Sequence, residues 1–438
     1  MSYFDTIVAP ITGSGPAAVA IVRLSGPEAW GVCERVFGAW PDDPVPRLAI
    51  YGRYSTGDDG LILPFEEGHS YTGEPAVEMS LHGSPASVRA LVEACLAAGA
   101  RIARPGEFTE RAFLNGRLDL TRAEAVRDTV EAQTDAQLRL ANLHREGALH
   151  REVTALREEA LSLLAAVEAS VDFSDEVGEL DRPLALSRLE SLSARLDGLL
   201  ATAESGRIMR QGLRIAIVGP PNAGKSSLLN ALLGHDRSIV TEIPGTTRDY
   251  VEESADLGGV PCVLIDTAGL RETEERIEAI GVERSRVIAE NADLVWYVVD
   301  GSAGTGPPPT PGAWTLLNKC DLVPESARTA AGCERGMASL FWISALTGEG
   351  LPELIAAVRG LAQLDGDIGP RIAPRHGPLL GRAREAIEGV RATLSNPIPD
   401  DLASVGLHEA IRALGEVTGE SASPDIIEQI FRDFCIGK

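Results

Sequence analysis

The sequence predicts a multidomain α+β fold in which an α/β domain is inserted into a helical domain, behind an N-terminal α/β domain. Three changes of sequence pattern predict this arrangement. Short β-like runs give way to long amphipathic helical patterns near residue 119, strand and helix patterns alternate from about residue 212, and helical patterns return near residue 378. The expected domains are therefore 1–118, then 119–210 together with 375–438, and 211–374 as the insertion.

Composition limits the class of protein. At 438 residues the chain is long enough for two or three domains, each with its own hydrophobic core. A formal net charge of −24 argues against a general nucleic-acid coat, and no apolar run is long enough to span a bilayer. The six cysteines form no CxxC pair, and no signal peptide precedes the first β-like run. We therefore expect a cytoplasmic protein without disulfides, a zinc site or membrane association.

Local patterns predict the elements of the N-terminal and helical domains. The runs "AAVAIVRLSG" and "PAVEMSLHG" predict strands within 1–118, and "SPASVRALVEACLAAG" predicts a helix. From 119 to about 173, apolar residues recur every three or four positions with very few helix breakers, which predicts long amphipathic helix. Further helices are expected over 182–206, from 378 to about 417, and from 424 to 433.

The pattern of the insertion predicts a parallel sheet. Five apolar runs alternate with helical patterns, as parallel strands joined by crossover helices do: "LRIAIVG", "CVLIDTAG", "DLVWYVVDG", "WTLLNKCD" and "LFWISA". One crossover departs from this rule, because residues 301–314 contain too many prolines and glycines for a helix. We expect an extended loop there.

The stretch "GPPNAGKSS", from Gly219 to Ser227, matches the phosphate-binding pattern GxxxxGK[ST]. It follows an apolar run and opens the helical pattern "KSSLLNALLG", which is the context that this pattern requires. Glycines let backbone N–H groups curl around phosphate at the start of a helix. Lys225 is expected to reach the β- and γ-phosphates, and the hydroxyl of Ser226 is expected to bind Mg²⁺.

Three further motifs lie at the ends of the predicted strands. In "DTAG", Asp266 is expected to hold Mg²⁺ through water, and the Gly269 amide to contact the γ-phosphate. In "NKCD", the carboxylate of Asp321 can accept both N1–H and N2–H of guanine, a pair that adenine lacks, while the stem of Lys319 covers the base. "SAL", from Ser344 to Leu346, is expected to contact the guanine O6 edge. The four motifs in this order predict a Ras-like α/β P-loop GTPase domain with GTP as substrate.

The catalytic part of this domain departs from the Ras pattern. Leu270 stands where a glutamine orients the attacking water in Ras-type proteins. In "TEIPGTTRD", Thr247 is the candidate switch threonine for Mg²⁺ and the γ-phosphate. Arg248 and Arg271 are candidates either for an arginine finger or for exposed ion pairs. The catalytic group is therefore expected elsewhere, and the acidic run "RETEERIE" lies nearby.

Lysine is scarce in this chain. Only three of the 40 basic residues are lysines, at positions 225, 319 and 438. Because arginine serves everywhere else, we interpret each lysine as a position where a guanidinium group cannot replace an ammonium group. Lys225 and Lys319 fit this interpretation, since both belong to nucleotide motifs. Lys438 ends the run "FCIGK", which fits a prenylation motif poorly and is expected to pack against the helical core near a second functional site.

Several motifs together resemble the MnmE (TrmE) family of tRNA modification GTPases. They are "GPPNAGKSSLLNALLG", "PGTTRD", "DTAGLRET", "NKCD", "RPGEFTERAFLNGRLDL" and the terminal "CIGK", in the family's order along essentially the full chain. The motif "PGTTRD" also occurs in ribosome-assembly GTPases, whereas the arginine-rich motif and "FCIGK" are more diagnostic. The resemblance implies a folate-binding-type N-terminal domain that forms a homodimer, a helical domain, and the inserted GTPase domain.

The resemblance also implies a reaction. The family works with a flavin-dependent partner, an MnmG-type subunit that binds FAD, in a heterotetramer. Together they install an aminomethyl-type (carboxymethylaminomethyl) group at C5 of the wobble uridine of certain tRNAs. The carbon comes from 5,10-methylene- or 5-formyl-tetrahydrofolate, with glycine or ammonium as co-substrate. GTP hydrolysis is activated when the two GTPase domains of the dimer approach each other across a K⁺ ion.

The resemblance implies roles for individual residues. Asn222 matches the K⁺-ligand asparagine of the family, and Thr241, Ile243 and Thr246 complete the implied K⁺ shell. Glu278 matches the general base that orients water; the alternative is a solvated glutamate in an acidic helix. The implied Mg²⁺ ligands are Ser226 and Thr247. The GTP-binding residues are expected to be Asn222, Ala223, Gly224, Lys225, Ser226, Ser227, Thr241, Glu242, Ile243, Pro244, Gly245, Thr246, Thr247, Asp266, Thr267, Ala268, Gly269, Asn318, Lys319, Asp321, Ser344, Ala345 and Leu346.

Four positions match the folate contacts of the family: Arg23, Glu78, Arg117 and Lys438. Arg117 departs from the pattern, because family members commonly carry lysine there. Arg23 and Glu78 have an alternative interpretation as an internal ion pair. Cys435 is either a thiol that acts on the carbon unit or a small buried residue.

A second class of function is a ribosome-assembly GTPase that acts as an rRNA-binding switch. Such a protein is expected to carry an appended basic RNA-binding module. Neither end of this acidic chain supplies one, so the sequence favours the tRNA modification enzyme.

Overall fold

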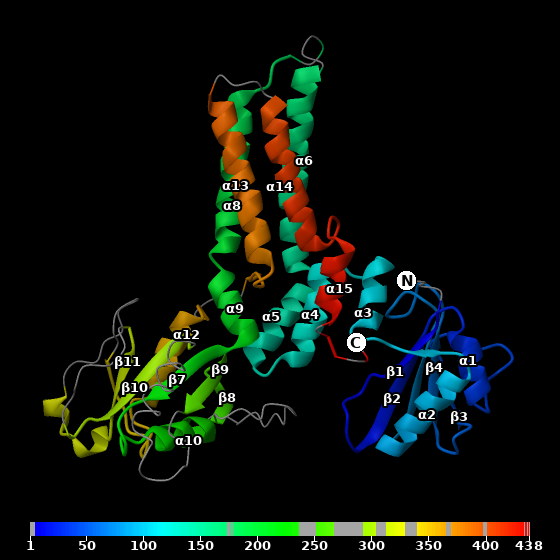
Figure 1. Cartoon of the computed structure of the whole chain (residues 1–438), viewed down its shortest axis with the longest axis horizontal. Coiled ribbons are helices and arrows are strands. Elements are labelled where there is room, and N and C mark those ends of the chain that lie inside the picture. The colour runs from blue at the N-terminus through cyan, green and yellow to red at the C-terminus, as the bar shows by residue number, and fades with distance from the viewer. Residues whose placement is uncertain are drawn as a thin grey trace, which may run out of the picture. The chain divides into compact units, whose positions relative to one another are not determined.

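The computed structural model describes residues 5–172, 176, 178–235, 251–266, 292–303, 312–328, 340–364, 369–396, 401–432, 434–435 and 437. The chain forms two compact units. The first consists of Met1–Arg127, His144–Leu192 and Arg382–Lys438, and the second of Asp128–Leu143 and Ser193–Gly381. Each unit contains one six-stranded sheet (Figure 1). The predicted division into three domains stays a prediction.

Helices carry the chain from one unit to the other. The chain passes between the units at Arg127–Asp128, Leu143–His144, Leu192–Ser193 and Gly381–Arg382. Each of these points lies inside a helix, namely α4 (Leu120–Glu131), α5 (Asp135–Arg145), α8 (Arg182–Leu200) and α13 (His376–Ser395). The units are therefore joined through continuous helical backbone at every crossing.

The sheet of the first unit has the strand order β3-β4-β5-β2-β1-β6. The pairs are antiparallel except β1–β6, which is parallel. Its strands are β1 (Ile7–Pro10), β2 (Ala17–Ser25), β3 (Ile50–Arg53), β4 (Asp59–Phe65), β5 (Ala76–Gly83) and β6 (Arg101–Ile102). The predicted strands "AAVAIVRLSG" and "PAVEMSLHG" are β2 and β5, and the predicted helix is α2 (Pro85–Ala97), so these predictions are confirmed.

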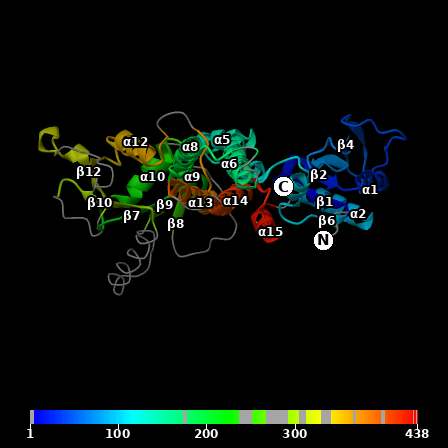
Figure 2. The ribbon, with the colours of Figure 1, turned by 90° about the horizontal axis from the view of Figure 1, so that it is seen from above.

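The two faces of this sheet differ because side chains alternate along each strand. On one face, Val22, Ile62 and Met79 form a core with buried residues of α1 (Ala29–Val36) and α2. The two helices lie side by side over that face (Figures 1 and 2). On the other face, Phe108 of α3 (Glu107–Leu114) packs on β1.

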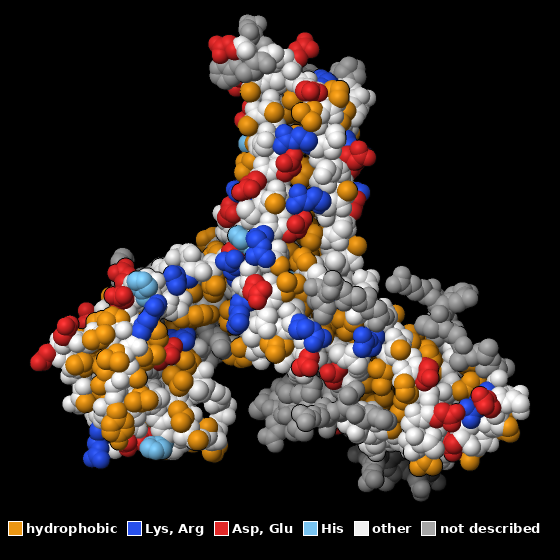
Figure 3. Space-filling view, turned by 180° about the vertical axis from the view of Figure 1, so that it is seen from behind, with side chains coloured by type: hydrophobic (Ala, Val, Ile, Leu, Met, Phe, Trp, Pro, Cys, Tyr) orange, Lys and Arg blue, Asp and Glu red, His pale blue; other side chains and the backbone are white. Residues whose placement is uncertain are grey.

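Among the described residues, the part of this second face over β3 and β4 is uncovered, and β5 separates these two strands from β2. Tyr51 pairs with Leu61 across these two strands, and both side chains are exposed, by 67% and 45%. Val19 on β2 lies on the same face and is 56% exposed. Figure 3 shows hydrophobic side chains gathered over the lobe that this sheet forms.

The helical part of the first unit contains α6 (Ala148–Asp172), α14 (Asp401–Thr418) and α15 (Pro424–Arg432). Helices α6 and α14 pack along each other (Figure 1). Arg157 of α6 pairs with Glu420, in the turn after α14, with an Nη1–Oε2 distance of 2.7 Å, and Figure 3 shows basic and acidic side chains interspersed along the long helices on the face that it displays. The predicted helices at 378–417 and 424–433 correspond to α13, α14 and α15.

The prediction of long helix from 119 to 173 needs correction, because the structure divides this stretch into α4, α5 and α6. Before α5, Thr134 and Gln137 form a capping box: the Gln137 amide donates to Thr134 Oγ1, and the Thr134 amide donates to Gln137 Oε1. Before α6, Gly147 adopts a φ of 84°, which favours glycine. The predicted helix at 182–206 is likewise two helices, α8 and α9 (Ala203–Gln211).

The sheet of the second unit has the order β12-β11-β10-β7-β9-β8. All its pairs are parallel except β8–β9. Its strands are β7 (Leu213–Val218), β8 (Val251–Leu257), β9 (Val260–Asp266), β10 (Leu294–Asp300), β11 (Trp314–Asn318) and β12 (Leu340–Trp342). The five predicted strands are confirmed, and β8 is an additional edge strand. The predicted loop 301–314 is non-helical at its described residues, and 304–311 lie outside the described part.

The core of the second unit lies against this sheet. Trp296 is fully buried among side chains of α10 (Lys225–His235) and α12 (Leu351–Leu361). Ala136 and Leu140 of α5 and Met209 of α9 belong to the same core. This core fixes the strand ends from which the nucleotide motifs project. Among the described residues, no helix combines the length and the apolar composition needed to cross a membrane.

Candidate functional site

The predicted phosphate-binding loop joins β7 to α10. Gly219 and Gly224 have φ values of 147° and 95°, and a Cβ atom on either would lie within 2.2 Å of another atom, at Val298 O or Asn318 Nδ2. Only glycine fits such positions, as the motif requires. Lys225 begins the helix, and its Nζ donates to the carbonyls of Gly219 and Pro220 at 2.8 and 2.9 Å. Burial lowers the pKa of this ammonium group.

The predicted Mg²⁺ position contains two oxygen donors from different elements. Ser226 Oγ, in the first turn of α10, donates to Asp266 Oδ2 at 3.1 Å. Asp266 ends β9 and is buried, being 4% exposed. A hydroxyl and a carboxylate oxygen side by side are ligands of the kind that Mg²⁺ prefers. The other predicted Mg²⁺ ligand, Thr247, lies outside the described residues.

Asn318 connects the phosphate loop with the base-recognition loop. Its Nδ2 donates to the Ala223 carbonyl at 2.8 Å, and its Oδ1 accepts from the Ala345 amide at 3.0 Å. Asn318 ends β11 and is buried. Both polar atoms of one side chain therefore hold together two loops that are far apart in the sequence.

The remaining base-recognition residues lie around this contact. Ser344 Oγ donates to Asp321 Oδ1 at 2.6 Å, so the predicted guanine carboxylate is held by the "SAL" loop. Leu346 of this loop is largely exposed. Lys319 has a φ of 63°, and its Nζ lies 2.6 Å from Asp300 Oδ2, at the end of β10. The hydrogen bond from Lys319 is the main cause that lowers the pKa of Asp300 to about 2.

Some of the remaining predicted residues are described, and the others fall outside the described part of the chain. Asn222 is described: it lies at the exposed tip of the phosphate loop with a φ of 61°. Ser227, in the first turn of α10, is also exposed. The predicted residues outside the described part are Thr241, Glu242, Ile243, Pro244, Gly245, Thr246, Thr247, Thr267, Ala268, Gly269, Glu278 and Lys438.

The first unit brings two of the predicted folate residues into direct contact. Arg23 on β2 pairs with Glu78 on β5, with Nε and Nη2 at 3.0 and 2.7 Å from Glu78 Oε1. The guanidinium group also lies 5.0 Å from the ring centre of Tyr71 and 5.4 Å from that of Phe108. These contacts place Arg23 in an aromatic cage where the covered part of the sheet face meets the open part.

The C-terminal segment packs against the N-terminal part of the first unit. Phe434 is buried with Phe431 among residues of α4. The backbone carbonyl of Cys435 accepts a hydrogen bond from the Gly106 amide at 3.3 Å, while its side chain is exposed. Gly437 fits so closely that a Cβ atom would lie 2.1 Å from the Pro10 carbonyl oxygen. Gly437 therefore lies against the end of β1, the strand that pairs with β2, which carries Arg23.

Arg117 lies in the same neighbourhood. It is exposed, and its stem runs beside Gly73, in the loop that also carries Tyr71. Tyr71, Phe108 and Asp300 were not predicted from the sequence as site residues. The run "PGEF" contains Phe108, and "VVDG" contains Asp300, so both motifs gave a signal that we did not use.

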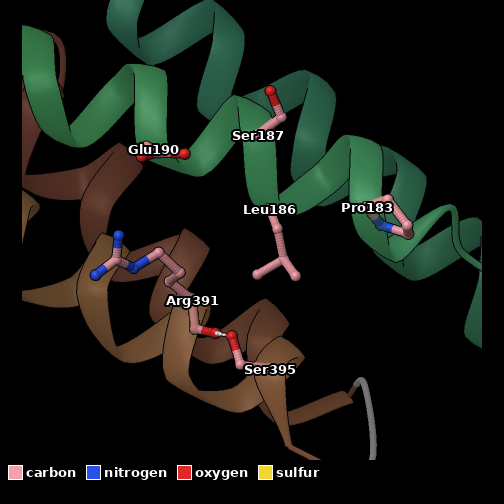
Figure 4. Close-up of a pocket in the computed structure, with 6 residues that line it drawn as sticks. All are labelled: Pro183, Leu186, Ser187, Glu190, Arg391 and Ser395. Carbon is pink, nitrogen blue, oxygen red and sulfur yellow. Dashed lines mark hydrogen bonds between the residues drawn. The ribbon is translucent and has the colours of Figure 1, made fainter.

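A further groove lies between α8 and α13 in the first unit. Figure 4 shows its lining residues, Pro183, Leu186, Ser187, Glu190, Arg391 and Ser395. Ser395 Oγ donates to the Arg391 carbonyl within α13. None of these residues belongs to a predicted site.

Comparison with known proteins decides the family. The sequence profile described as "MnmE helical domain" matches residues 120–435, and the profile "GTP-binding protein TrmE N-terminus" matches residues 6–117. The chain belongs to the MnmE family. The predicted family, the multidomain α+β fold and the GTPase class are thereby confirmed.

Individual MnmE proteins match along their whole length. The protein named tRNA modification GTPase MnmE from Symbiobacterium thermophilum is 41% identical over 454 aligned residues, covering 99% of either chain. The protein of the same name from Thermus thermophilus is 42% identical and covers 100% of both chains. Among solved structures, the G domain of the T. maritima FeoB iron transporter covers 34% of this chain and 99% of its own, at 26% identity. Its TM-score of 0.24 is too low to support an argument about the fold.

Proposed function

We propose that this MnmE-family GTPase modifies tRNA by adding an aminomethyl-type group at C5 of the wobble uridine, together with a flavin-dependent MnmG-type subunit. One-carbon tetrahydrofolate supplies the carbon, and GTP hydrolysis drives the complex. The observation that carries the proposal is the link through Asn318 between the phosphate loop and the base-recognition loop. This link between the two loops supports a guanine nucleotide pocket, and the chain matches MnmE proteins over its full length. With tRNA as substrate, the proposed location is the cytoplasm.

Mg²⁺ fits the residues of the pocket. Ser226 and Asp266 offer hard oxygen donors next to the ammonium group of Lys225, and all three would face the phosphates of GTP. Bound there, Mg²⁺ would neutralise charge that develops between the β- and γ-phosphates. Lys225 would bind and orient the same phosphates, and Asp321 would select guanine.

We propose that K⁺ and Glu278 together replace the catalytic glutamine that is missing at Leu270. A leucine cannot orient water, so the chain needs a carboxylate from elsewhere and a cation in the place of an arginine finger. Asn222 at the exposed tip of the phosphate loop is the described part of the proposed K⁺ shell. An exposed position there suits a site that is completed when a second GTPase domain approaches.

The folate proposal is supported by the chemistry around Arg23. Pterin rings present N–H donors that a carboxylate such as Glu78 accepts, and glutamyl carboxylates pair with guanidinium groups such as that of Arg117. Tyr71 and Phe108 add aromatic faces for a planar ring. The C-terminal segment, which brings the Cys435 backbone to Gly106, would place Lys438 near the same edge of the sheet.

The first experiment is mass spectrometry of wobble uridine in tRNA from cells that lack this protein. We expect the carboxymethylaminomethyl-type modification to disappear, and to return when the wild-type gene is restored. Unchanged modification together with accumulated ribosomal precursors would contradict the proposal and would favour the ribosome-assembly class.

A second experiment tests the catalytic assignment. Glu278→Ala should lower kcat for GTP by at least about 100-fold, the usual contribution of a general base, while nucleotide affinity is retained. Glu275→Ala, from the same acidic run, is the matched control and should change kcat little. Replacing K⁺ by Na⁺ should slow the wild-type enzyme sharply. Normal turnover in Glu278→Ala would show that Glu278 is not the general base. An equal rate in K⁺ and Na⁺ would show that the proposed K⁺ site does not activate hydrolysis.

A further inference from the structure

Arg328 lies against the turn that carries the proposed guanine ligand. The turn is the 3₁₀ helix η1 (Cys320–Leu322) that follows β11, and Arg328 comes directly after a second one, η2 (Glu325–Ala327). Its guanidinium group donates from Nη2 to Cys320 O in this turn at 2.7 Å and from Nε to the carbonyl of Val323, directly after the turn, at 3.1 Å. The side chain is 18% exposed.

The third nitrogen of this guanidinium group reaches another loop. Nη1 donates to Glu349 Oε1 at 2.5 Å. Glu349 lies in the loop after "SAL", and its backbone carbonyl accepts a hydrogen bond from the Ser344 amide at 2.9 Å. Ser344 in turn holds Asp321 through its hydroxyl at 2.6 Å. The contacts therefore form a closed ring: the turn with Asp321, then Arg328, Glu349 and Ser344, and back to Asp321.

We propose that Arg328 is a positioning residue for guanine recognition, which sets the orientation of the Asp321 carboxylate by clamping the η1 turn to the loop that carries Ser344. The proposal rests on the proposed role of Asp321 as the guanine ligand. In this proposal Arg328 acts through its contacts with the turn and with Glu349, not by binding the nucleotide itself. A planar guanidinium group can donate hydrogen bonds to two carbonyls and one carboxylate at once. The ammonium group of a lysine, on a flexible stem, reproduces this fixed arrangement of donors poorly.

The clamp affects base selection because of the geometry of the guanine contact. A carboxylate that accepts both N1–H and N2–H of guanine must lie in the plane of the base with both oxygens directed at it. Hypoxanthine lacks the 2-amino group, so inosine diphosphate forms only one of the two bonds. If the turn is released, the second bond weakens first, and the preference for GDP over inosine diphosphate becomes smaller.

The test uses the full chain and the variant Arg328→Gln, which keeps a similar length and removes the charge. Dissociation constants for GDP and for inosine diphosphate are measured by competition with a fluorescent guanine nucleotide. We expect the constant for GDP to rise about tenfold, as for the loss of one charge-assisted hydrogen bond, and the constant for inosine diphosphate to rise several times less. Arg328→Lys should recover only part of the preference, and kcat at saturating GTP should change less than twofold.

Controls separate this inference from general destabilisation and from the proposed site. Glu325→Gln removes a nearby charge but none of the three hydrogen bonds that the Arg328 guanidinium group donates to Cys320, Val323 and Glu349, and should leave both constants nearly unchanged. If Arg328→Gln raises both constants equally, the role is merely structural and the inference is overturned. Should that variant fail to fold, Glu349→Gln loosens the same ring and must lower the preference in the same direction. If Asp321→Asn leaves the preference for GDP over inosine diphosphate unchanged, the proposed guanine site itself is wrong. If Asp321→Asn changes this preference and Arg328→Gln does not, only the inference about Arg328 is wrong.

Discussion

Arg111 shows how strongly one residue can depend on its partners. It is 1% exposed in the first unit, and its guanidinium group reaches Asp5, Glu74 and Glu107 at 2.7, 3.1 and 3.1 Å. Arg101 supplies a second cation to Glu107 at 2.7 Å. Burying such charges is costly, and removing one partner of a buried pair typically costs about 3–5 kcal/mol because the other charge is left unpaired. This cluster fixes the start of α3, from which Phe108 contacts Arg23.

Glu107 and Glu110, in the same helix, should respond to pH with opposite sign. Burial opposes ionisation of Glu107, but hydrogen bonds from Arg101, the Arg104 amide and Arg111 outweigh it and lower its pKa to about 2. Its contribution to stability is therefore complete above its ordinary pKa of 4.5 and is lost as the pH falls toward 2. Glu107→Gln should lower the free energy of unfolding by about 3 kcal/mol at pH 7, and the difference from wild type should shrink below about pH 4.5.

Glu110 is the matched control for this prediction. Burial, the largest cause, raises its pKa, so its ionised form destabilises the folded state near neutral pH. Glu110→Gln should therefore be neutral or stabilising at pH 7. Urea titrations of both variants at several pH values measure the two signs. A pH-independent loss in Glu107→Gln would show that its carboxylate is not held ionised by these partners.

At the scale of residues, sequence motifs indicated the residues expected to bind nucleotide, but not the residues that hold those side chains in position. Lys225, Lys319 and Asp321 follow from motifs whose spacing reflects the shape of a nucleotide, and the scarcity of lysine supported the two lysine assignments. Asp300 and Arg328 hold neighbouring motif residues through ion pairs and hydrogen bonds that depend on where the strands end in space. The strand ending "VVDG" already offered Asp300 as a candidate, whereas no motif marks Arg328, so the support from Arg328 emerged only from the structure.

At the scale of elements, Gly106 connects the start of α3 with the C-terminal segment. It has a φ of 67°, and a Cβ atom there would lie 2.4 Å from the Phe431 carbonyl oxygen. Gly116, at the other end of the same helix, has a φ of 68° but no atom within 4 Å of a Cβ. The two glycines therefore share one backbone conformation and differ in their surroundings.

Alanine substitutions at these two positions should separate the backbone cost from the packing cost. Gly116→Ala should lower the free energy of unfolding by about 1–2 kcal/mol, the cost of a left-handed conformation for a residue with a Cβ atom. Gly106→Ala should cost clearly more and should expose the C-terminal segment to protease, because Phe431 must move. Equal effects of the two substitutions in urea unfolding and limited proteolysis would contradict this docking of the segment.

Helices and strands were predicted well where they are buried on both faces and their sequence is therefore mostly apolar. The parallel strands β7, β9, β10 and β11 are continuous apolar runs because both faces are covered. The edge strand β8, "VEESADL", contains three acidic residues and forms no continuous apolar run. It was therefore not recognised as a strand from the sequence. The division between α4, α5 and α6 depends on a Thr134–Gln137 capping box and one glycine, which are weak signals inside a strong helical pattern.

At the scale of the whole molecule, the open face of the first sheet is the surface that fits the proposed homodimer. Tyr51 and Leu61 are exposed side by side there, and contiguous exposed apolar side chains are typical of interaction surfaces. A second copy that covers them would also lie next to Arg23, at the border of the same face.

Leu61→Glu should therefore weaken the dimer. A carboxylate on this face would be desolvated in the interface, so sedimentation velocity at micromolar concentration should show mainly monomer. Leu402→Glu, at a comparably exposed leucine of α14, is the control and should leave the dimer intact. GDP affinity should be unchanged in both variants. A stable dimer in Leu61→Glu would place the interface elsewhere.

The helical crossings described above have a practical consequence for dissecting this enzyme. A gene fragment that encodes either unit would have to be cut inside α4, α5, α8 or α13, so its product would begin or end with half a helix whose hydrogen-bonding groups have lost their partners. Truncated proteins would therefore report the damage of the cut as well as the loss of the missing unit. Substitutions in the intact chain, such as those above, are the sound way to assign each activity to its part.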